Sequence, residues 1–334
     1  MVQSIILISI KAIPKMMLKN RSILVTGGAG FIGSHLVDRL LSGNEVTVLD
    51  NFSSGRRENL ARHSENPDFT LVEADLLDAD ALQRAVRGKD MVFHVAANPD
   101  VKLGAADTRV HLDQNVLATY NLLEAMRTAG VRRIAFTSTS TVYGEANVVP
   151  TPEDYGPLKP ISLYGASKLS CEALISSYCH TFGMQSWIYR FANIIGERGT
   201  HGVLVDFIRK LQENPRELEI LGSGRQSKSY LDVKECVDAM AHCVDHSREE
   251  TSIFNIGSED AIDVNRIADS VADRMGLDGV KYKYTGGFDG RGWKGDVKVM
   301  QLSIEKIRGL GWSPHLGSAE AVAAAVDALL RQME

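Results

Sequence analysis

Cysteine is scarce in this chain of 334 residues, and the few cysteines follow no ligand spacing. The four are Cys171, Cys179, Cys236 and Cys243, with no CxxC pair among them, and no histidine pair has the spacing of a zinc site. We therefore expect no metal centre and no disulfide framework. Small buried thiols in a reducing compartment are the simplest interpretation, which predicts a cytoplasmic protein.

Long apolar runs and an excess of positive charge are also missing. The apolar run 4–10 is too short to span a bilayer, and it has neither the preceding basic residues nor the cleavage site of a signal peptide. A net charge of −5 argues against nucleic-acid binding, because phosphate backbones are met by clustered lysine and arginine. These absences predict a small-molecule partner, with no membrane and no nucleic acid.

What the chain does contain is an alternation of β-branched runs with helical periodicity. Strands are predicted near 22–26, 45–49, 69–73, 91–97, 133–139 and 186–192, with helices between most of them. This alternation predicts an α/β fold with a Rossmann-type, doubly wound parallel sheet. The second half has helices near 202–213, 233–246, 264–275 and 318–332, and strands near 218–221 and 252–256. We expect it to form a smaller, mixed α/β substrate domain.

The segment 25–33 places three glycines in a GxxGxxG pattern between a predicted strand and a predicted helix. Gly27 allows a tight turn, Gly30 lets backbone N–H groups approach a pyrophosphate, and Gly33 lets the helix pack closely on the strand. In this context the pattern predicts a dinucleotide cradle. Phe31 and Ile32, at the start of the helix, are expected to border the same ligand.

Asp50 ends the second predicted strand, twenty residues after the central glycine of the cradle. Its carboxylate would accept hydrogen bonds from both ribose hydroxyls and repel a 2′-phosphate, which predicts NAD as the cofactor. Arg56 and Arg57 keep NADP open as an alternative. Further cofactor contacts are expected at strand ends and in the loops beside them: Asn51, Ser54, Gly55, Asp75, Leu76, Ala96, Ala97 and Asn115.

Three regions follow from these patterns. They are an N-terminal extension (1–20), an NAD-binding domain (21–195) and a substrate-binding region (196–334). Within the last, we expect the segment 225–260 to pack back on the NAD-binding domain. Met16 and Met17 lie just before the first strand, so we interpret residues 1–18 as the product of a mistaken upstream start.

Tyr164 and Lys168 lie four residues apart at the start of a predicted helix, so their side chains share one face. A free phenol has a pKa near 10, and a neighbouring ammonium favours the phenolate; lowering that pKa by about three units takes roughly 4 kcal/mol. The Ser/Thr-rich segment 137–144 follows the fifth strand, where ligands bind in such sheets, and one of its hydroxyls can share a hydrogen bond with the reacting oxygen. The combination predicts proton transfer beside a nicotinamide.

With these motifs the chain resembles the extended short-chain dehydrogenases/reductases, and within them the UDP-glucose (UDP-galactose) 4-epimerases of archaeal type. The resemblance can be followed from Ser22 to the C-terminus. It implies that Tyr164, Lys168 and Thr139 are catalytic and that Tyr164 and Lys168 also contact NAD. By the same resemblance a homodimer is expected, through the helices near 109–129 and 165–182.

The resemblance also implies a set of substrate contacts. They are Thr139, Tyr164, Asn193, Lys228, Arg291, Asp296 and Met300. Asn193 would hold the diphosphate of the UDP-sugar, and Arg291 is the expected loop arginine. Many relatives carry Arg-Asp where this chain has Lys228 and Ser229, so one diphosphate contact becomes a point charge instead of a bidentate fork. Met300 takes the position linked to room around the C2 substituent of the sugar.

Ser140 and Thr141 distinguish branches of this family. Related 4,6-dehydratases and decarboxylases carry acidic residues there, so the two hydroxyl residues favour epimerisation at C4. The resemblance implies that Tyr164 takes the C4 hydroxyl proton while NAD accepts a hydride and later returns it. Two alternatives stay open: a 4-epimerase for another nucleotide sugar, such as UDP-glucuronate or UDP-N-acetylglucosamine, and an NAD-binding protein without turnover.

Overall fold

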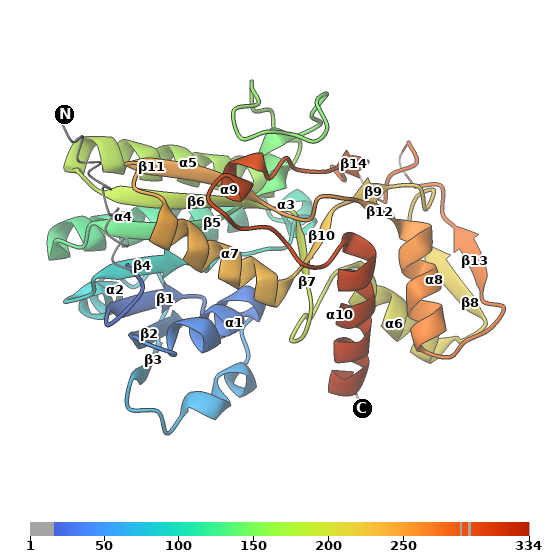
Figure 1. The fold of residues 1–334 in the computed structure, drawn as a ribbon, viewed down its shortest axis with the longest axis horizontal. Helices are drawn as coiled ribbons and strands as arrows, with labels where there is room; N and C mark the ends of the chain where they lie inside the picture. The colour runs from blue at the N-terminus through green and yellow to red at the C-terminus, as the bar shows by residue number, and fades with distance from the viewer. Residues whose placement is uncertain (1–16, 288, 293–294, 334) are drawn as a thin grey trace, which may run out of the picture.

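A seven-stranded parallel sheet forms the centre of the computed structural model, which describes residues 17–287, 289–292 and 295–333. Its strand order is β11-β6-β5-β4-β1-β2-β3 (Figure 1). The strands are β1 (Ser22–Thr26), β2 (Glu45–Asp50), β3 (Phe69–Glu73), β4 (Met91–His94), β5 (Arg133–Thr139), β6 (Gln185–Phe191) and β11 (Thr251–Ile256). The predicted doubly wound sheet is confirmed. The extension predicted for residues 1–20 lies almost entirely outside the described residues.

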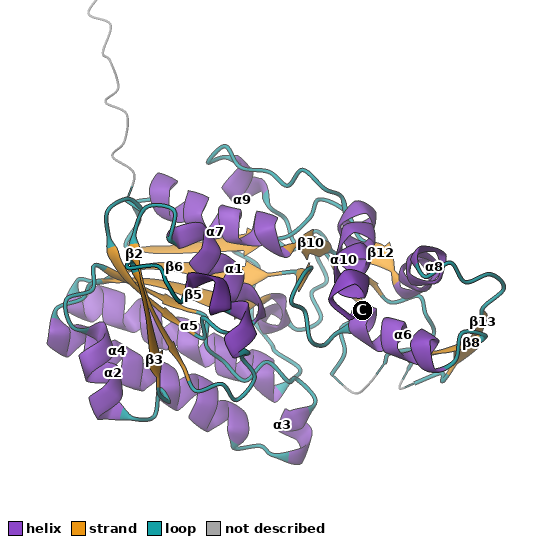
Figure 2. Ribbon diagram, turned by 90° about the horizontal axis from the view of Figure 1, so that it is seen from below, coloured by secondary structure: helices purple, strands orange, loops and turns teal. Residues whose placement is uncertain are grey.

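Helices cover both faces of the sheet (Figure 2). One face is covered by α2 (Ala79–Val86), α4 (Ala118–Ala129) and α5 (Leu163–Phe182), the other by α1 (Phe31–Leu40) and α7 (Val233–His246). Along β5, Ile134 and Phe136 belong to the core beneath α4 and α5, whereas Ala135 belongs to the core beneath α1 and α7. Both faces are apolar, which explains why these strands are nearly continuous hydrophobic runs.

The chain after β6 contributes to both parts of the molecule. Its strand β11 pairs with β6, and α7 packs against α1, so this part of the chain completes the central sheet. A second core gathers α6 (Val203–Glu213), α8 (Val264–Arg274) and α10 (Ser318–Met333) around β8 (Glu217–Ile220) and its partner β13 (Lys281–Tyr284). This smaller body stands at the carboxyl ends of the central strands (Figures 1 and 2).

Short elements connect the larger helices and strands. They are β7 (Asn193–Ile195), β9 (Ser227–Lys228), β10 (Tyr230–Asp232), β12 (Ile262–Asp263), β14 (Val299–Met300), α3 (Leu103–Ala106), α9 (Glu305–Arg308), the 3-10 turns η1 (Arg57–Asn59), η2 (Ala61–His63) and η4 (Ser140–Tyr143), and the π-helix η3 (Leu112–Leu117). The π-helix precedes α4 directly and was not predicted. Over the described residues, no helix combines the length and the apolar character that crossing a membrane requires.

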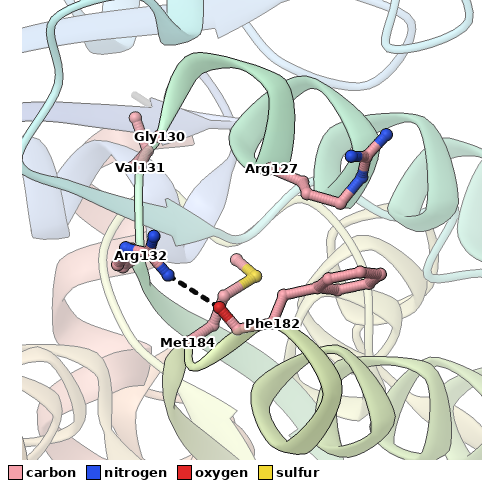
Figure 3. Close-up of a pocket in the computed structure, with 6 residues that line it drawn as sticks. All are labelled: Arg127, Gly130, Val131, Arg132, Phe182 and Met184. Atoms are coloured by element: carbon pink, nitrogen blue, oxygen red, sulfur yellow. Dashed lines mark hydrogen bonds between the residues drawn. The ribbon is translucent and has the colours of Figure 1, made fainter.

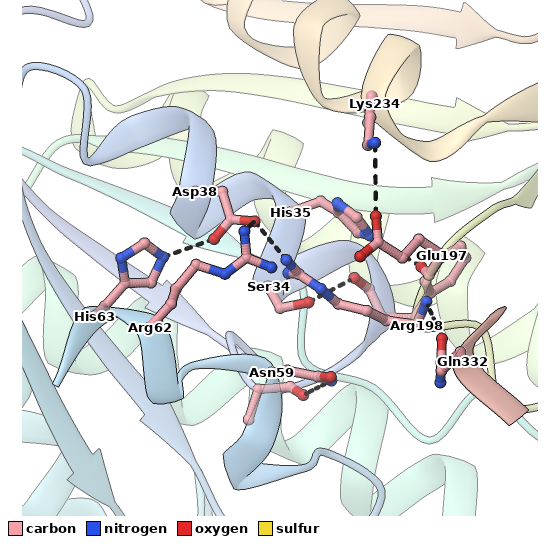
Figure 4. Close-up of polar contacts among 12 residues, drawn as sticks. Ser34, His35, Asp38, Asn59, Arg62, His63, Glu197, Arg198, Lys234 and Gln332 are labelled. Atoms are coloured by element: carbon pink, nitrogen blue, oxygen red, sulfur yellow. Dashed lines mark hydrogen bonds and ion pairs between the residues drawn. The ribbon is translucent and has the colours of Figure 1, made fainter. Parts of the chain in front are cut away.

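A polar cluster ties the two cores together beside α1 (Figure 4). The guanidinium of Arg198 donates a 2.7 Å hydrogen bond to Asp38 on α1, and its backbone N–H donates to the side chain of Gln332 on α10 at 2.8 Å. Asp38 also pairs with His63 at 2.6 Å. Arg198 is a non-glycine residue with a φ of 66°, a conformation that these contacts hold in place.

Candidate functional site

The three glycines of the cradle meet different constraints. Gly27 has a φ of 71°, and a Cβ there would lie 2.6 Å from the backbone of Ala96. A Cβ on Gly33 would lie 2.0 Å from the carbonyl oxygen of Gly27, so α1 packs directly on the turn. A Cβ on Gly30 would meet, among the described residues, only that same oxygen at 3.2 Å. The geometry therefore matches the predicted roles: turn, open approach for a ligand, and close packing.

Gly28 is also sterically constrained, which the GxxGxxG pattern does not indicate. A Cβ at this position would lie 2.6 and 2.7 Å from the two methyl groups of Val48 on β2. The requirement comes from a neighbouring strand twenty residues away in the chain, and no local pattern signals it.

Asp50 sits at the end of β2 with its carboxylate turned to the cradle. It accepts hydrogen bonds from the backbone N–H groups of Ala29 at 2.9 Å and Phe52 at 2.8 Å. Burial raises its pKa, and the two N–H donors act in the opposite direction. Each carboxylate oxygen has a second lone pair, which leaves acceptors for ribose hydroxyls. Arg57, one of the two residues that kept NADP open, pairs with Glu73 at 2.5 Å.

The other predicted cofactor residues surround this corner at varied depths. The Asn51 side chain donates to Asp75 at 2.7 Å, and a Cβ on Gly55 would touch both Ala29 and Asp50. Ser54 is exposed, Leu76 is buried in the core beneath α2 and α4, and Phe31, Ile32, Ala96 and Ala97 are half-buried. Asp75 lies two residues beyond the end of β3, in the loop beside the strand end.

Asn115 lies in the π-helix η3 and links three segments. Its side-chain oxygen accepts from the backbone N–H of Asn98 at 2.8 Å, and its amide donates to Ser167 at 2.9 Å. The Ser167 hydroxyl in turn donates to the carbonyl of Tyr164 at 2.8 Å. Asn115 therefore fixes the loop after β4 against the first turns of α5.

Lys168 lies on the buried face of α5, above the sheet. Its ammonium donates a 2.8 Å hydrogen bond to the carbonyl of Thr137 on β5 and lies 4.6 Å from the ring centre of Phe136. Burial lowers the pKa of Lys168 to about 8. Helix α5 begins after Ser162, whose hydroxyl accepts from the N–H of Gly165 at 3.1 Å, and this cap sets the position of the first turn.

Tyr164 stands one turn before Lys168, with its ring packed edge-on against His111 at 5.6 Å between ring centres. Burial raises the pKa of Tyr164 above its ordinary value. A lowering of this pKa by Lys168 has to overcome the loss of hydration at Tyr164, and the ammonium is itself bonded to the Thr137 carbonyl.

Thr139 closes β5 and caps the following turn, η4. Its hydroxyl accepts from the N–H of Thr141 at 3.2 Å and lies 3.1 Å from the Thr141 hydroxyl. The two residues that follow the cap, Ser140 and Thr141, bring hydroxyl groups to this end of the sheet. Strand β5 and helix α5 thus bring the three predicted catalytic residues to the same region.

The predicted substrate residues gather at the junction of the two cores. The ammonium of Lys228 pairs with the carboxylate of Asp296 at 2.6 Å, and the guanidinium of Arg291 donates to the Asp296 carbonyl at 2.8 Å. Arg291 also pairs with Glu145 at 2.5 Å. These contacts join residues 68 and 146 positions apart in the chain.

Asn193 and Met300 flank this group. Asn193 lies on β7 and its amide donates to the carbonyl of Ser229 at 3.4 Å, next to Lys228 in the chain. Met300 is paired with Lys228 across β14 and β9, and its side chain packs on the small apolar cluster that includes Tyr143.

A surface pocket elsewhere contains none of the predicted site residues. It is lined by Arg127, Gly130, Val131, Arg132, Phe182 and Met184, at the C-terminal ends of α4 and α5 (Figure 3). Tyr164 and Lys168 lie at the opposite end of α5. Among the described residues, no cluster of three or more histidine, cysteine or acidic side chains is arranged to hold a metal ion.

A buried polar group that was not predicted from the sequence lies beneath the candidate catalytic residues. Glu172 on α5, Arg190 on β6 and Ser138 on β5 are all less than a tenth exposed, and Arg190 and Ser138 both donate hydrogen bonds to the Glu172 carboxylate. Two signals were available: Glu172 follows Lys168 by one helical turn on an apolar face, and Arg190 interrupts the hydrophobic run of β6.

Comparison with known proteins gives consistent matches. Residues 23–257 match the model of the NAD dependent epimerase/dehydratase family. A putative UDP-glucose 4-epimerase of Methanocaldococcus jannaschii is 35% identical over 313 residues, which cover 91% of this chain and 97% of that protein.

Solved structures agree over almost the whole chain. A crystal structure of a UDP-galactose 4-epimerase is 43% identical, with a TM-score of 0.83, and covers 94% of this chain and 100% of its own. The UDP-N-acetylglucosamine 4-epimerase of Methanobrevibacter ruminantium, solved with UDP-N-acetylmuramic acid, is 30% identical, with a TM-score of 0.85 and the same coverage.

Proposed function

Because the chain belongs to the NAD-dependent epimerase/dehydratase family, we propose that it is a 4-epimerase that interconverts UDP-glucose and UDP-galactose. The cofactor is NAD. The observation that carries the proposal is the convergence of Tyr164 and Lys168 on α5 with Thr139 at the end of β5, followed by hydroxyl residues in place of acids. An extra acid is what elimination of water from the sugar would need.

The residues present fit the cofactor. The open side of Gly30, the packing of Gly33 and the Asp50 carboxylate beside the cradle suit a pyrophosphate followed by a ribose with two free hydroxyls. When bound, NAD supplies the acceptor and donor for the hydrogen at C4 of the sugar.

The protein's own residues handle the proton. Tyr164, as phenolate, takes the proton of the C4 hydroxyl and returns it at the end of the cycle, and Thr139 shares a hydrogen bond with the same oxygen. Burial raises the pKa of Tyr164, so positive charge in the dry site must offset that rise before the phenolate forms. Lys168 provides such a charge one turn away on α5.

Epimerisation requires a sugar that turns while its nucleotide stays anchored. Asn193, Lys228 and Arg291 offer an amide and two cations for a diphosphate at the junction of the cores. Both cations are held by carboxyl or carbonyl oxygens of Glu145 and Asp296, which positions them before a substrate arrives. Because these contacts anchor the diphosphate, the side chains around the sugar need not bind it and can be small or apolar.

The test is conversion of UDP-galactose to UDP-glucose by the purified protein without added nucleotide, followed by chromatography of the sugars. We expect turnover, and we expect Tyr164→Phe to abolish it while the variant still binds NAD, because the phenyl ring keeps the packing on His111 and loses only the acid–base group. Full activity in Tyr164→Phe would refute the assignment of the base.

A second candidate substrate is UDP-N-acetylglucosamine. Met300 packs on the apolar cluster beside the site and is flexible enough to make room for an N-acetyl group, and a structural neighbour is named for that sugar. Rates on equal concentrations of UDP-galactose and UDP-N-acetylglucosamine distinguish the two. A higher kcat/KM on the N-acetyl sugar would replace the first assignment.

For the assembly, the proposal is a homodimer through α4 and α5. Leu117, Tyr120 and Phe182 on or beside these helices are each at least 40% exposed, which is unusual for large apolar side chains on neighbouring surface helices. Light scattering of the purified protein should give twice the chain mass of 36.6 kDa. A mass of one chain at micromolar concentration would contradict it.

A further inference from the structure

A buried ion pair lies one helical turn beyond Lys168. Both side chains, Glu172 and Arg190, are about 5% exposed or less. The guanidinium donates to one carboxylate oxygen at 2.7 Å through Nη2 and to the other at 3.1 Å through Nε. The remaining Nη1 donates to the carbonyl of Glu153 at 3.1 Å. The pair is therefore a bidentate link between α5 and β6, with no charge exposed to water.

The same carboxylate anchors the end of β5. The hydroxyl of Ser138 donates to Glu172 at 2.5 Å, and the next residue along the strand is Thr139. On the other side of Ser138, the Thr137 carbonyl accepts from the Lys168 ammonium at 2.8 Å. Two successive residues of β5 are thus bound to two successive turns of α5, immediately before the residue that carries the candidate catalytic hydroxyl.

Stability alone does not account for this arrangement. Buried ion pairs contribute little to folding compared with well-packed apolar residues of the same volume, so Glu172 and Arg190 need another explanation. Their common feature is the link to Ser138 and, through it, to the strand end that must face Tyr164. Resting on the proposed function, we propose that Glu172 is a positioning residue that, with Arg190, holds the end of β5 and the Lys168 turn of α5 in register for proton transfer.

The negative charge of Glu172 also affects the protonation of Lys168. Titratable groups near Lys168 come from β4, from the residue before η3 and from α5: His94, His111, Tyr164, Cys171 and Glu172. Burial lowers the pKa of His94 to about 3 and also lowers that of His111, and it raises the pKa values of Tyr164 and Cys171, so these four are neutral near pH 7. The carboxylate of Glu172, which is paired with Arg190, lies on the same helix face and acts against the burial that lowers the pKa of Lys168.

Two variants separate the anchor from the charge. Ser138→Ala removes the anchor and leaves the ion pair. Glu172→Gln keeps an acceptor for Ser138, removes the negative charge and leaves the buried Arg190 cation without its carboxylate partner. Ser177→Ala, an exposed serine on the same helix, and Glu124→Gln, a half-buried carboxylate that accepts two hydrogen bonds from Arg127 and one from Tyr178, are the matched controls. We expect the controls to keep wild-type kcat, KM and pH dependence.

For Ser138→Ala we expect kcat to fall roughly 10- to 100-fold with KM nearly unchanged, because a small misplacement of a catalytic group weakens the transition state more than substrate binding. For Glu172→Gln we expect the fall of activity at high pH to begin at lower pH, since Lys168 loses its proton more easily. Wild-type kcat in Ser138→Ala overturns the positioning role, and it does so even if Glu172→Gln fails to fold.

The pH dependence of NAD binding can be measured without turnover, so it tests this inference separately from the proposed function. Lys168 is expected to bind the ribose as a cation, so NAD affinity should weaken as pH rises through its pKa, and that transition should move to lower pH in Glu172→Gln but not in Glu124→Gln. If the wild type converts no UDP-hexose, the proposed function fails while this comparison still decides the role of Glu172. An unmoved NAD transition in a folded Glu172→Gln overturns the charge role.

Discussion

The sharpest prediction concerns two glycines of the cradle that look alike in sequence and differ in structure. In Gly33→Ala the new Cβ would lie 2.0 Å from the Gly27 oxygen and 2.9 Å from the Gly28 Cα, whereas ordinary contacts are about 3.5 Å. The turn and α1 must therefore separate by about 1 Å or more. In Gly30→Ala the one close contact is 3.2 Å, which a shift of a few tenths of an ångström relieves.

The magnitudes follow from this geometry. Forced overpacking costs about 1–3 kcal/mol, and the preference of alanine over glycine inside a helix returns up to about 1 kcal/mol, so Gly33→Ala should lose about 1–2 kcal/mol. For a chain of this size that corresponds to a fall in Tm of about 1.5–3 °C. Gly30→Ala should stay within about 0.5 kcal/mol of the wild type, yet bind NAD at least tenfold more weakly, because its methyl group occupies the space of the pyrophosphate.

The assay combines thermal unfolding of the NAD-free protein with a calorimetric titration of NAD. Gly43→Ala is the control, since a Cβ there would have no neighbour within 4 Å among the described residues. Each variant should affect mainly one quantity: Gly33→Ala stability, Gly30→Ala affinity. If Gly30→Ala binds NAD like the wild type, or if Gly33→Ala is as stable as Gly43→Ala, the assignment of the cradle is wrong.

Two further predictions concern buried charges. Lys168→Met should abolish epimerisation but stabilise the NAD-free fold by about 1–2 kcal/mol. Burial lowers the pKa of Lys168 from 10.5 to about 8, so the buried ammonium costs about 3 kcal/mol of stability, which the variant regains. Loss of the hydrogen bond to Thr137 offsets part of that gain. The unfolded lysine binds its proton more tightly, so the contribution of Lys168 to stability rises between pH 8 and 10.5. The stability advantage of Lys168→Met over the wild type, measured by chemical denaturation, should therefore narrow over this range. Asp50→Ala should weaken NAD binding roughly 10- to 100-fold through loss of a charged acceptor and narrow the preference over NADP; unchanged discrimination in titrations would contradict the role of Asp50.

Local patterns were enough to predict the central fold and the cradle. Strand and helix periods alternate over the first half of the chain, and a GxxGxxG between a strand and a helix has one common structural context, so Gly27, Gly30 and Gly33 could be placed without coordinates. The four-residue spacing of Tyr164 and Lys168 likewise fixes a shared helix face. The small strands β9, β12 and β14 were missed, because two-residue strands carry no periodic signal.

Features set by contacts across the fold were out of reach. The steric constraint at Gly28 comes from Val48 on a neighbouring strand. The left-handed conformation of Arg198 is held by contacts with Asp38 and Gln332. The sequence around Gly28 or Arg198 gives no signal of either feature. Lys228 and Asp296 were grouped as substrate contacts only through a family resemblance, and their ion pair was not predicted. Local sequence specifies backbone tendencies, whereas these contacts depend on which distant side chains the fold brings together.

The electrostatics of the site explain why a buried carboxylate belongs beneath it. Exclusion of water raises the pKa of Tyr164 and lowers that of Lys168, so burial by itself favours the neutral forms of both groups, although proton transfer needs a phenolate and a cation. A carboxylate in direct contact with Lys168 would neutralise the cation that Tyr164 requires. Placed one turn away and held by Arg190, Glu172 supports the lysine cation without pairing with it, and its bond to Ser138 makes the same group a mechanical anchor for Thr139.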